Sequence, residues 1–252
     1  MFVVWGRKLV YRKMGYIADF CPICRSPQQF ELKRIGSASH VYYVSFGEGQ
    51  LAGYERTCGG CRITFRAEPS AYASISKTPE PLAALTTQTF PNLDIAYRDR
   101  LALEEKVRRA PTSLSTDERR ALIRSPFLLL SPKVEKRFAS THIDKEVGVS
   151  MAAAVAALIA GPALTRALAP DASGMAALVF IALGVLLVVW QIFRSRRRFM
   201  MRQVVPVLAS AIRPLKPTES ELKFVLAELT QLKHKIGTKL KLADLISAQV
   251  CE

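Results

Sequence analysis

Histidine is scarce in this 252-residue chain, and the signatures of common catalytic sites are missing. The three histidines, His40, His142 and His234, lie far apart in the sequence. There is no G-x-x-x-x-G-K-[ST] or G-x-G-x-x-G phosphate loop, no G-x-S-x-G elbow and no H-E-x-x-H helix. Acidic pairs such as Glu104-Glu105 are typical of solvated helix faces. These absences predict that the protein is not an enzyme.

Acidic residues are also few, with 21 Asp and Glu against 36 Lys and Arg, a formal net charge of +15. The excess is uneven: residues 1–66 hold ten basic and four acidic residues and residues 194–252 hold twelve and five, but residues 147–193 hold one of each. Basic flanks around a neutral block suit the membrane face that carries anionic lipids. A nucleic-acid partner is the weaker interpretation, because positive-inside bias already explains the basic residues.

Long apolar runs are confined to residues 147–193. Met175–Phe193 is uncharged and is followed by Arg194-Ser195-Arg196-Arg197-Arg198. A helix of that length covers roughly 28 Å, close to the hydrocarbon thickness of a bilayer. Val147–Leu164 is also uncharged but consists mostly of alanine, so it is a marginal span by itself. The alternative is a buried helical hairpin of a soluble domain.

Charge bias and thiol chemistry favour two spans over one. A transmembrane hairpin places the cysteines and the arginine cluster on the same, cytosolic side, whereas a single span separates them. Small residues on the first segment, Ser150, Ala154, Ala157 and Gly161, would let the second helix approach closely, and they also allow a homo-oligomer. We therefore expect a two-pass protein of the cytoplasmic (inner) membrane, with the lipid bilayer as partner and both termini cytosolic.

Cysteine occurs five times, and four of the residues form two C-x-x-C pairs. The start of the chain is apolar, but Arg7 and Lys8 interrupt it before the apolar core of a signal sequence would be complete, so we expect the N-terminal part to stay in the cytosol. That compartment keeps thiols reduced, which favours metal binding over disulfides. Cys251 is left over, and we assign it no role.

The expected metal ligands are Cys21, Cys24, Cys58 and Cys61. Four thiolates complete a tetrahedral shell, so the predicted cofactor is a structural Zn²⁺ with no open position for water. Iron would use the same four ligands. A redox C-x-x-C normally opens a helix after a βαβ strand, and neither pair has that context.

The remaining pattern predicts an α+β protein with four regions. Residues 1–66 read as short strands broken at Gly6 and at Gly36–Ser39 around the cysteines, a zinc ribbon. Residues 67–146 read as a Pro-rich linker, irregular over Glu68–Pro91, and two helices. Residues 147–193 form the transmembrane hairpin, and residues 194–252 hold a basic segment and an amphipathic helix.

The helix predictions rest on caps and apolar spacing. Leu93–Arg109 reads as one helix, and a capping box at Ser115 opens a second that is broken near Pro126. Another capping box, Thr218-Glu219-Ser220-Glu221, opens the C-terminal helix, which ends near Gly237. Its apolar stripe consists of Leu222, Val225, Leu226, Leu229 and Leu232, and we expect internal core to cover it.

The first quarter of the chain resembles the bacterial zinc-ribbon family. The resemblance rests on the opening Met1-Phe2-Val3-Val4-Trp5-Gly6, on Cys21-Pro22-Ile23-Cys24 and on the closing Cys58-Gly59-Gly60-Cys61. It implies a rubredoxin-like ribbon and a bound metal, but little about activity. Arg25 and Arg62 follow the second cysteine of each pair, where ribbons usually have glycine. Residues 67–252 resemble no family that we recognise.

Binding or scaffolding is the function that these features favour. A rigid ribbon would present its basic residues, Arg7, Lys8, Arg12, Lys13, Lys33 and Arg34, to a protein partner at the membrane. The second interpretation is a thiol-based redox or metal sensor, in which oxidation or zinc loss alters the hairpin. The third is a nucleic-acid-binding ribbon, which steep salt dependence of binding would reveal.

Overall fold

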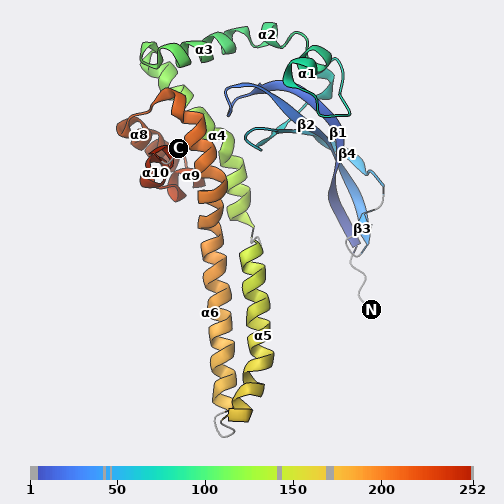
Figure 1. Cartoon of the computed structure of the whole chain (residues 1–252), viewed down its shortest axis with the longest axis vertical. Helices are drawn as coiled ribbons and strands as arrows, with labels where there is room; N and C mark the ends of the chain where they lie inside the picture. The colour runs from blue at the N-terminus through green and yellow to red at the C-terminus, as the bar shows by residue number, and fades with distance from the viewer. Residues whose placement is uncertain (1–4, 42–43, 46, 141–143, 169–172, 251–252) are drawn as a thin grey trace. The chain divides into compact units, whose positions relative to one another are not determined.

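A five-stranded antiparallel sheet opens the chain in the computed structural model, which describes residues 5–41, 44–45, 47–140, 144–168 and 173–250 (Figure 1). The strands follow the order β1-β2-β4-β5, with β3 paired to β2. Their bounds are β1 Trp5–Cys21, β2 Ser26–Val41, β3 Val44–Ser45, β4 Gln50–Cys58 and β5 Thr64–Arg66. With the helices that follow, the sheet confirms the α+β class.

The first two strands are much longer than predicted. β1 continues through Gly6 and β2 through Gly36–Ser39, where we expected breaks, while the predicted strand residues 2–4 lie outside the described part of the chain. Gly36 does not mark a turn. It allows the backbone of Glu48 to approach β2 closely, because a Cβ at Gly36 would lie 1.9 Å from the carbonyl oxygen of Glu48.

The Pro-rich segment after the sheet packs against it, which corrects the expected irregular linker. Leu82–Thr89 forms helix α1, and Pro81 lies before it at the N-cap, outside the helix interior where proline would remove a hydrogen bond. The Thr89 hydroxyl accepts a hydrogen bond of 2.9 Å from the amide of Ala18 on β1, and Leu85 is fully buried. The predicted helix over residues 93–109 is divided at Tyr97 into α2 (Leu93–Ala96) and α3 (Arg98–Arg109).

The chain divides into two compact units between Ser115 and Thr116. The second unit is helical. Its α-helices are α4 Thr116–Ala139, α5 Lys145–Leu168, α6 Ser173–Phe199, α7 Val205–Ile212, α8 Glu219–Gln231, α9 Lys235–Lys239 and α10 Leu242–Val250. Met200–Val204, between α6 and α7, is a π-helical turn.

α4 begins where the Ser115 capping box predicted but is not broken near Pro126. It continues through Pro126 and Pro132 to Ala139. An internal proline costs about 3 kcal/mol or more. Burial offsets that cost, because Ile123, Phe127 and other apolar side chains of α4 are fully buried.

The C-terminal amphipathic helix is confirmed as α8. The Thr218 hydroxyl and the Glu221 carboxylate form the predicted capping box. Leu222, Val225, Leu226 and Leu229 are buried within the helical unit, so internal core covers this part of the stripe as expected. Leu232 corrects the prediction, because it follows the last residue of the helix and is 52% exposed. The helix ends at Gln231, earlier than predicted, and α9 follows after the left-handed Lys233.

α5 and α6 lie side by side as two long antiparallel helices (Figure 1). Their contact uses the small residues singled out above: Ser150 and Ala154 are buried, and a Cβ at Gly161 would lie 2.7 Å from the Phe180 ring. The predicted turn between them falls partly on residues 169–172, outside the described part of the chain. α6 does not end at Phe193 but carries the arginine cluster as far as Phe199.

One helix among the described residues, Leu178–Leu215, is long and apolar enough to cross a membrane. That length includes most of α6, the π-helical turn, α7 and the short 3-10 turn Arg213–Leu215. α5 does not qualify within the described residues, so a second span is not shown.

Candidate metal centre

Each cysteine pair stands at a tight turn between two antiparallel strands. Cys21 ends β1 and Cys24 lies in the turn that leads into β2, while Cys58 ends β4 and Cys61 lies in the turn that leads into β5. β2 pairs with both β1 and β4, so that Ser26 lies opposite Cys21 and Phe30 opposite Cys58. This shared strand brings the two turns to the same end of the sheet.

The four sulfur atoms form a cage of the size that one metal ion needs. All lie within 4.8 Å of one another, with 3.6 Å between Cys21 Sγ and Cys61 Sγ and 3.8 Å between Cys24 Sγ and Cys58 Sγ. A tetrahedral ion with metal–sulfur bonds of about 2.3 Å has sulfur–sulfur edges of about 3.8 Å. Disulfide sulfurs would lie about 2.05 Å apart, and all four thiols are free.

Backbone geometry repeats between the two turns. The amide of Arg25 donates to the Cys21 carbonyl at 2.8 Å, and that of Arg62 donates to the Cys58 carbonyl at 3.1 Å. Both arginines are left-handed, with φ of 59° and 60°. They therefore adopt the backbone conformation of the glycines usual at these positions, so their side chains do not distort the turns.

Burial and proximity couple the thiols. One cysteine of each pair, Cys21 and Cys58, is fully buried, and its neighbour Cys24 or Cys61 is half-buried. The hydrogen bond with Cys24 raises the pKa of Cys21, and the hydrogen bond from Cys21 lowers the pKa of Cys58. A divalent cation bound in the cage would displace the thiol protons, because metals bind the thiolate form.

A buried ion pair behind the first turn was missed by the sequence analysis. Arg25 Nε lies 2.6 Å from Glu104 Oε2, and both side chains are nearly inaccessible, with exposures of 6% and 3%. Arg100 contacts the other oxygen of Glu104 at 2.9 Å. Glu104 is therefore not part of a solvated face as predicted; it anchors the residue after Cys24 to α3.

A second buried carboxylate, Asp19, lies two residues before Cys21. Its Oδ2 accepts a hydrogen bond of 2.5 Å from the Tyr72 hydroxyl and its Oδ1 accepts one of 2.9 Å from Tyr97, while Arg56 pairs with it from β4. Burial raises the pKa of Tyr72, which keeps its hydroxyl protonated as a donor. The network ties the segment after the sheet to the strand that carries Cys21. The sequence signal for this buried carboxylate was a lone Asp between Ala18 and Phe20 in an apolar run.

The other candidate residues do not join the cage. His40 lies opposite Gly6, whereas Cys21 lies opposite Ser26 at the other end of the same strand pair, which agrees with its predicted place outside the ligand set. Cys251 is outside the described residues. The four cysteines are thus brought together as a possible metal site, and no histidine of the described residues joins them; His142 lies outside the described part of the chain.

Comparison of the chain with known protein families, with curated proteins and with solved structures finds no match.

Proposed function

We propose that this chain is a membrane-anchored protein-interaction module built on a rubredoxin-like zinc ribbon with one structural Zn²⁺. The closed sulfur cage carries the proposal. Four thiolates from two matching turns leave no position for water or substrate, which is the arrangement of a structural site and not of a catalytic one. Membership of the bacterial zinc-ribbon family is part of the proposal, and the paired strands with a cysteine turn at the end of each pair support it.

Exposed apolar side chains support the membrane anchor. On α6, Leu178 and Phe193 are 67% and 69% exposed, and on α5 Ile159 is 73% exposed. Water would contact apolar surface along both helices at a cost of about 25 cal/mol for each Å². A bilayer removes that cost, and a soluble core helix would not be so exposed. A two-pass topology in the inner membrane, with both termini cytosolic, is part of the proposal, and the antiparallel hairpin and the basic residues at its open end support it.

The outer edge of the sheet supports an interaction role. β1 is an edge strand, and among the described residues its outer side makes one β-bridge, from Tyr16 to Ser76. Trp5 is 81% exposed, and Leu9 and Tyr11 are about half exposed on the same strand. Arg7 and Lys8 beside them are exposed as well. An edge with free backbone groups, apolar side chains and positive charge suits an extended acidic segment of a partner protein.

Metal content and membrane extraction together test the anchor and the ribbon. We expect the detergent-purified wild type to hold one zinc per chain and Cys58→Ser to lose it, while both proteins stay in the membrane after alkaline carbonate washing. Absence of metal together with titratable thiols would contradict the zinc site. Iron in place of zinc would contradict the assignment of the ion as Zn²⁺. Release by carbonate would contradict the anchor without bearing on the metal.

Photo-cross-linking tests the interaction role. A cross-linking residue placed at Tyr11 should trap a partner, and Leu9→Glu should abolish the product because it places a like charge against an acidic segment. The matched position is Phe224, which is also half exposed but lies in the helical unit. Equal cross-linking from both positions would contradict a specific edge.

A redox or metal sensor is the second candidate, and the half-buried Cys24 and Cys61 favour it, because an oxidant can reach them. Zinc that is released by mild peroxide and rebound after reduction would support the sensor. Retention of zinc under the same treatment would contradict the sensor and support the structural role of the metal.

A further inference from the structure

A basic pocket of about 360 Å³ opens between the end of α4, the start of α5 and the end of α6. Five cationic side chains line it: Lys133, Lys136, Arg137, Arg198 and Arg202. Two carboxylates, Asp144 and Glu146, also line it, so three positive charges are in excess. Every lining residue belongs to the helical unit.

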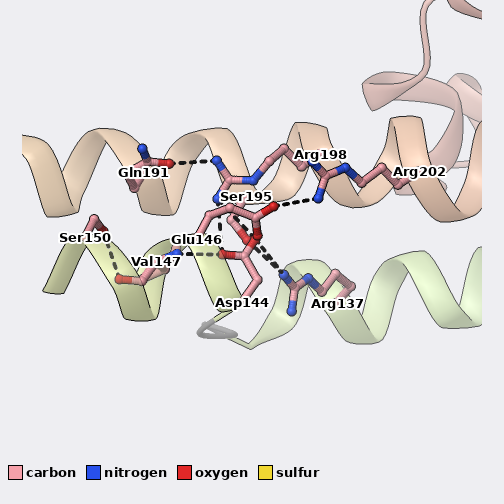
Figure 2. Close-up of polar contacts among 9 residues, drawn as sticks. All are labelled: Arg137, Asp144, Glu146, Val147, Ser150, Gln191, Ser195, Arg198 and Arg202. Carbon is pink, nitrogen blue, oxygen red and sulfur yellow. Dashed lines mark hydrogen bonds and ion pairs between the residues drawn. The ribbon is translucent and has the colours of Figure 1, made fainter. Parts of the chain in front are cut away.

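Asp144 organises the arginines of the pocket (Figure 2). It caps α5 by accepting from the Val147 amide at 3.0 Å, and Arg198 Nη2 donates to its two oxygens at 3.1 and 3.2 Å. Arg137 donates to the buried Ser195 hydroxyl at 2.8 Å. Burial by itself would raise the pKa of Asp144, but hydrogen bonds from Ser195, the Val147 amide and Arg198 lower it, so the carboxylate stays charged.

The polar contacts hold the arginines without neutralising the pocket. Arg198 also donates to Gln191 at 2.7 Å, yet its buried Nε has no hydrogen-bond partner among the described residues. The π-helical turn Met200–Val204 begins directly after α6 and contains Arg202 and Gln203, which line the pocket. A π-helical turn interrupts the regular hydrogen bonding of an α-helix, and such turns often occur at functional sites.

Apolar surface continues from the pocket along the hairpin. Val149 and Met151 are exposed on α5 immediately after the capped turn, and Trp190 and Phe193 are exposed on α6 just before the arginine cluster. Arg194 lies over the Trp190 ring, 4.9 Å from its centroid. Aromatic and arginine side chains at the end of an apolar helix are typical of the membrane interface.

We propose that this pocket binds the phosphate of an anionic phospholipid headgroup, with the acyl chains against the apolar faces of α5 and α6. Charge excess selects a negative headgroup, and the adjoining apolar surface selects a lipid over a soluble anion. Arg137 and Arg198 are held in place by Asp144 and Ser195, so Lys133 and Lys136, one turn apart on α4, are the cations to vary. This inference rests on the proposed membrane anchor.

The test uses the full-length wild type in detergent, titrated with three probes: short-chain phosphatidylglycerol, short-chain phosphatidylcholine and inorganic phosphate. We expect saturable binding of phosphatidylglycerol at one site per chain, with much weaker binding of the other two. Equal affinity for both lipids would overturn the headgroup selectivity. Equal affinity for inorganic phosphate would make the pocket a site for a free anion and overturn the lipid assignment.

Variants locate the site. Lys133→Ala with Lys136→Ala should weaken phosphatidylglycerol binding about 25-fold, from about five-fold for each basic residue near anionic lipid. Lys223→Ala with Lys235→Ala removes the same charge from exposed positions that do not line the pocket and should leave affinity unchanged. Glu146→Gln, which frees Arg202 from its 2.6 Å ion pair, should tighten binding a few-fold.

One further measurement distinguishes failure of the membrane anchor from failure of the pocket alone. Carbonate extraction of the wild type tests whether the protein is anchored in the membrane, and its result does not depend on which lipid headgroup the pocket prefers. An extractable wild type contradicts the anchor and removes the basis of the lipid proposal. A wild type that resists extraction, with both lysine pairs equally affected, overturns the pocket alone.

Discussion

Removing the Glu104 carboxylate should loosen the cysteine cage, although Glu104 is not a ligand. Glu104→Gln keeps the size of the side chain but leaves Arg25 as a buried cation, with its side chain 6% exposed and its ion pair lost. Breaking a buried pair in this way costs about 3–5 kcal/mol. Arg25 follows Cys24 directly and sits in the left-handed position of the first turn, so the loss falls on the part of the fold that positions two ligands.

Zinc affinity is the most direct measure of that loss, because metal binding is coupled to folding of the site. If the whole cost of about 3–5 kcal/mol appears in the metal-bound form, chelator competition should show zinc affinity lowered by about two to four orders of magnitude. Glu105→Gln is the matched control. Glu105 is the next residue of α3 but is 45% exposed and pairs with the exposed Arg109, so its loss should cost less than about 1 kcal/mol. Equal zinc affinity in the two variants would refute the reasoning.

Two further predictions address the second cysteine turn and the helical unit. Arg62→Gly should stabilise the sheet unit by about 1 kcal/mol in denaturant unfolding, because glycine adopts the left-handed φ of 60° without strain; Arg25→Gly relieves similar strain but loses its ion pair, and should destabilise. The hydrogen bond from Arg119 lowers the pKa of Glu221. A carboxyl with a lowered folded pKa contributes stability above its unfolded pKa and loses it as the pH falls through the folded value. Thermal melts below about pH 4.5 should therefore show a steeper loss of stability in the wild type than in Glu221→Gln, and parallel acid limbs would contradict that assignment.

The sequence by itself determined features that depend on local spacing. Two C-x-x-C pairs identified the four residues that the structure brings together, since the ligand spacing within a turn is independent of the rest of the fold. The capping box at Thr218 and the apolar stripe after it predicted α8, because helix caps and 3.6-residue periodicity are read along one element. The small residues of α5 likewise predicted the face that packs on α6.

Features that depend on long-range packing were decided only by the tertiary structure. Gly6 and Gly36 look like strand breaks in sequence, but pairing of β1 with β2 over nearly their whole length carries both strands past them. Pro126 looks like a helix end, and burial of α4 overrides it. Glu104 differs from Glu105 through Arg25, which is 79 positions away in the chain, so no local pattern separates the buried carboxylate from the exposed one. The basic pocket likewise draws on residues from Lys133 to Gln203, and it exists because three helix ends meet around Asp144.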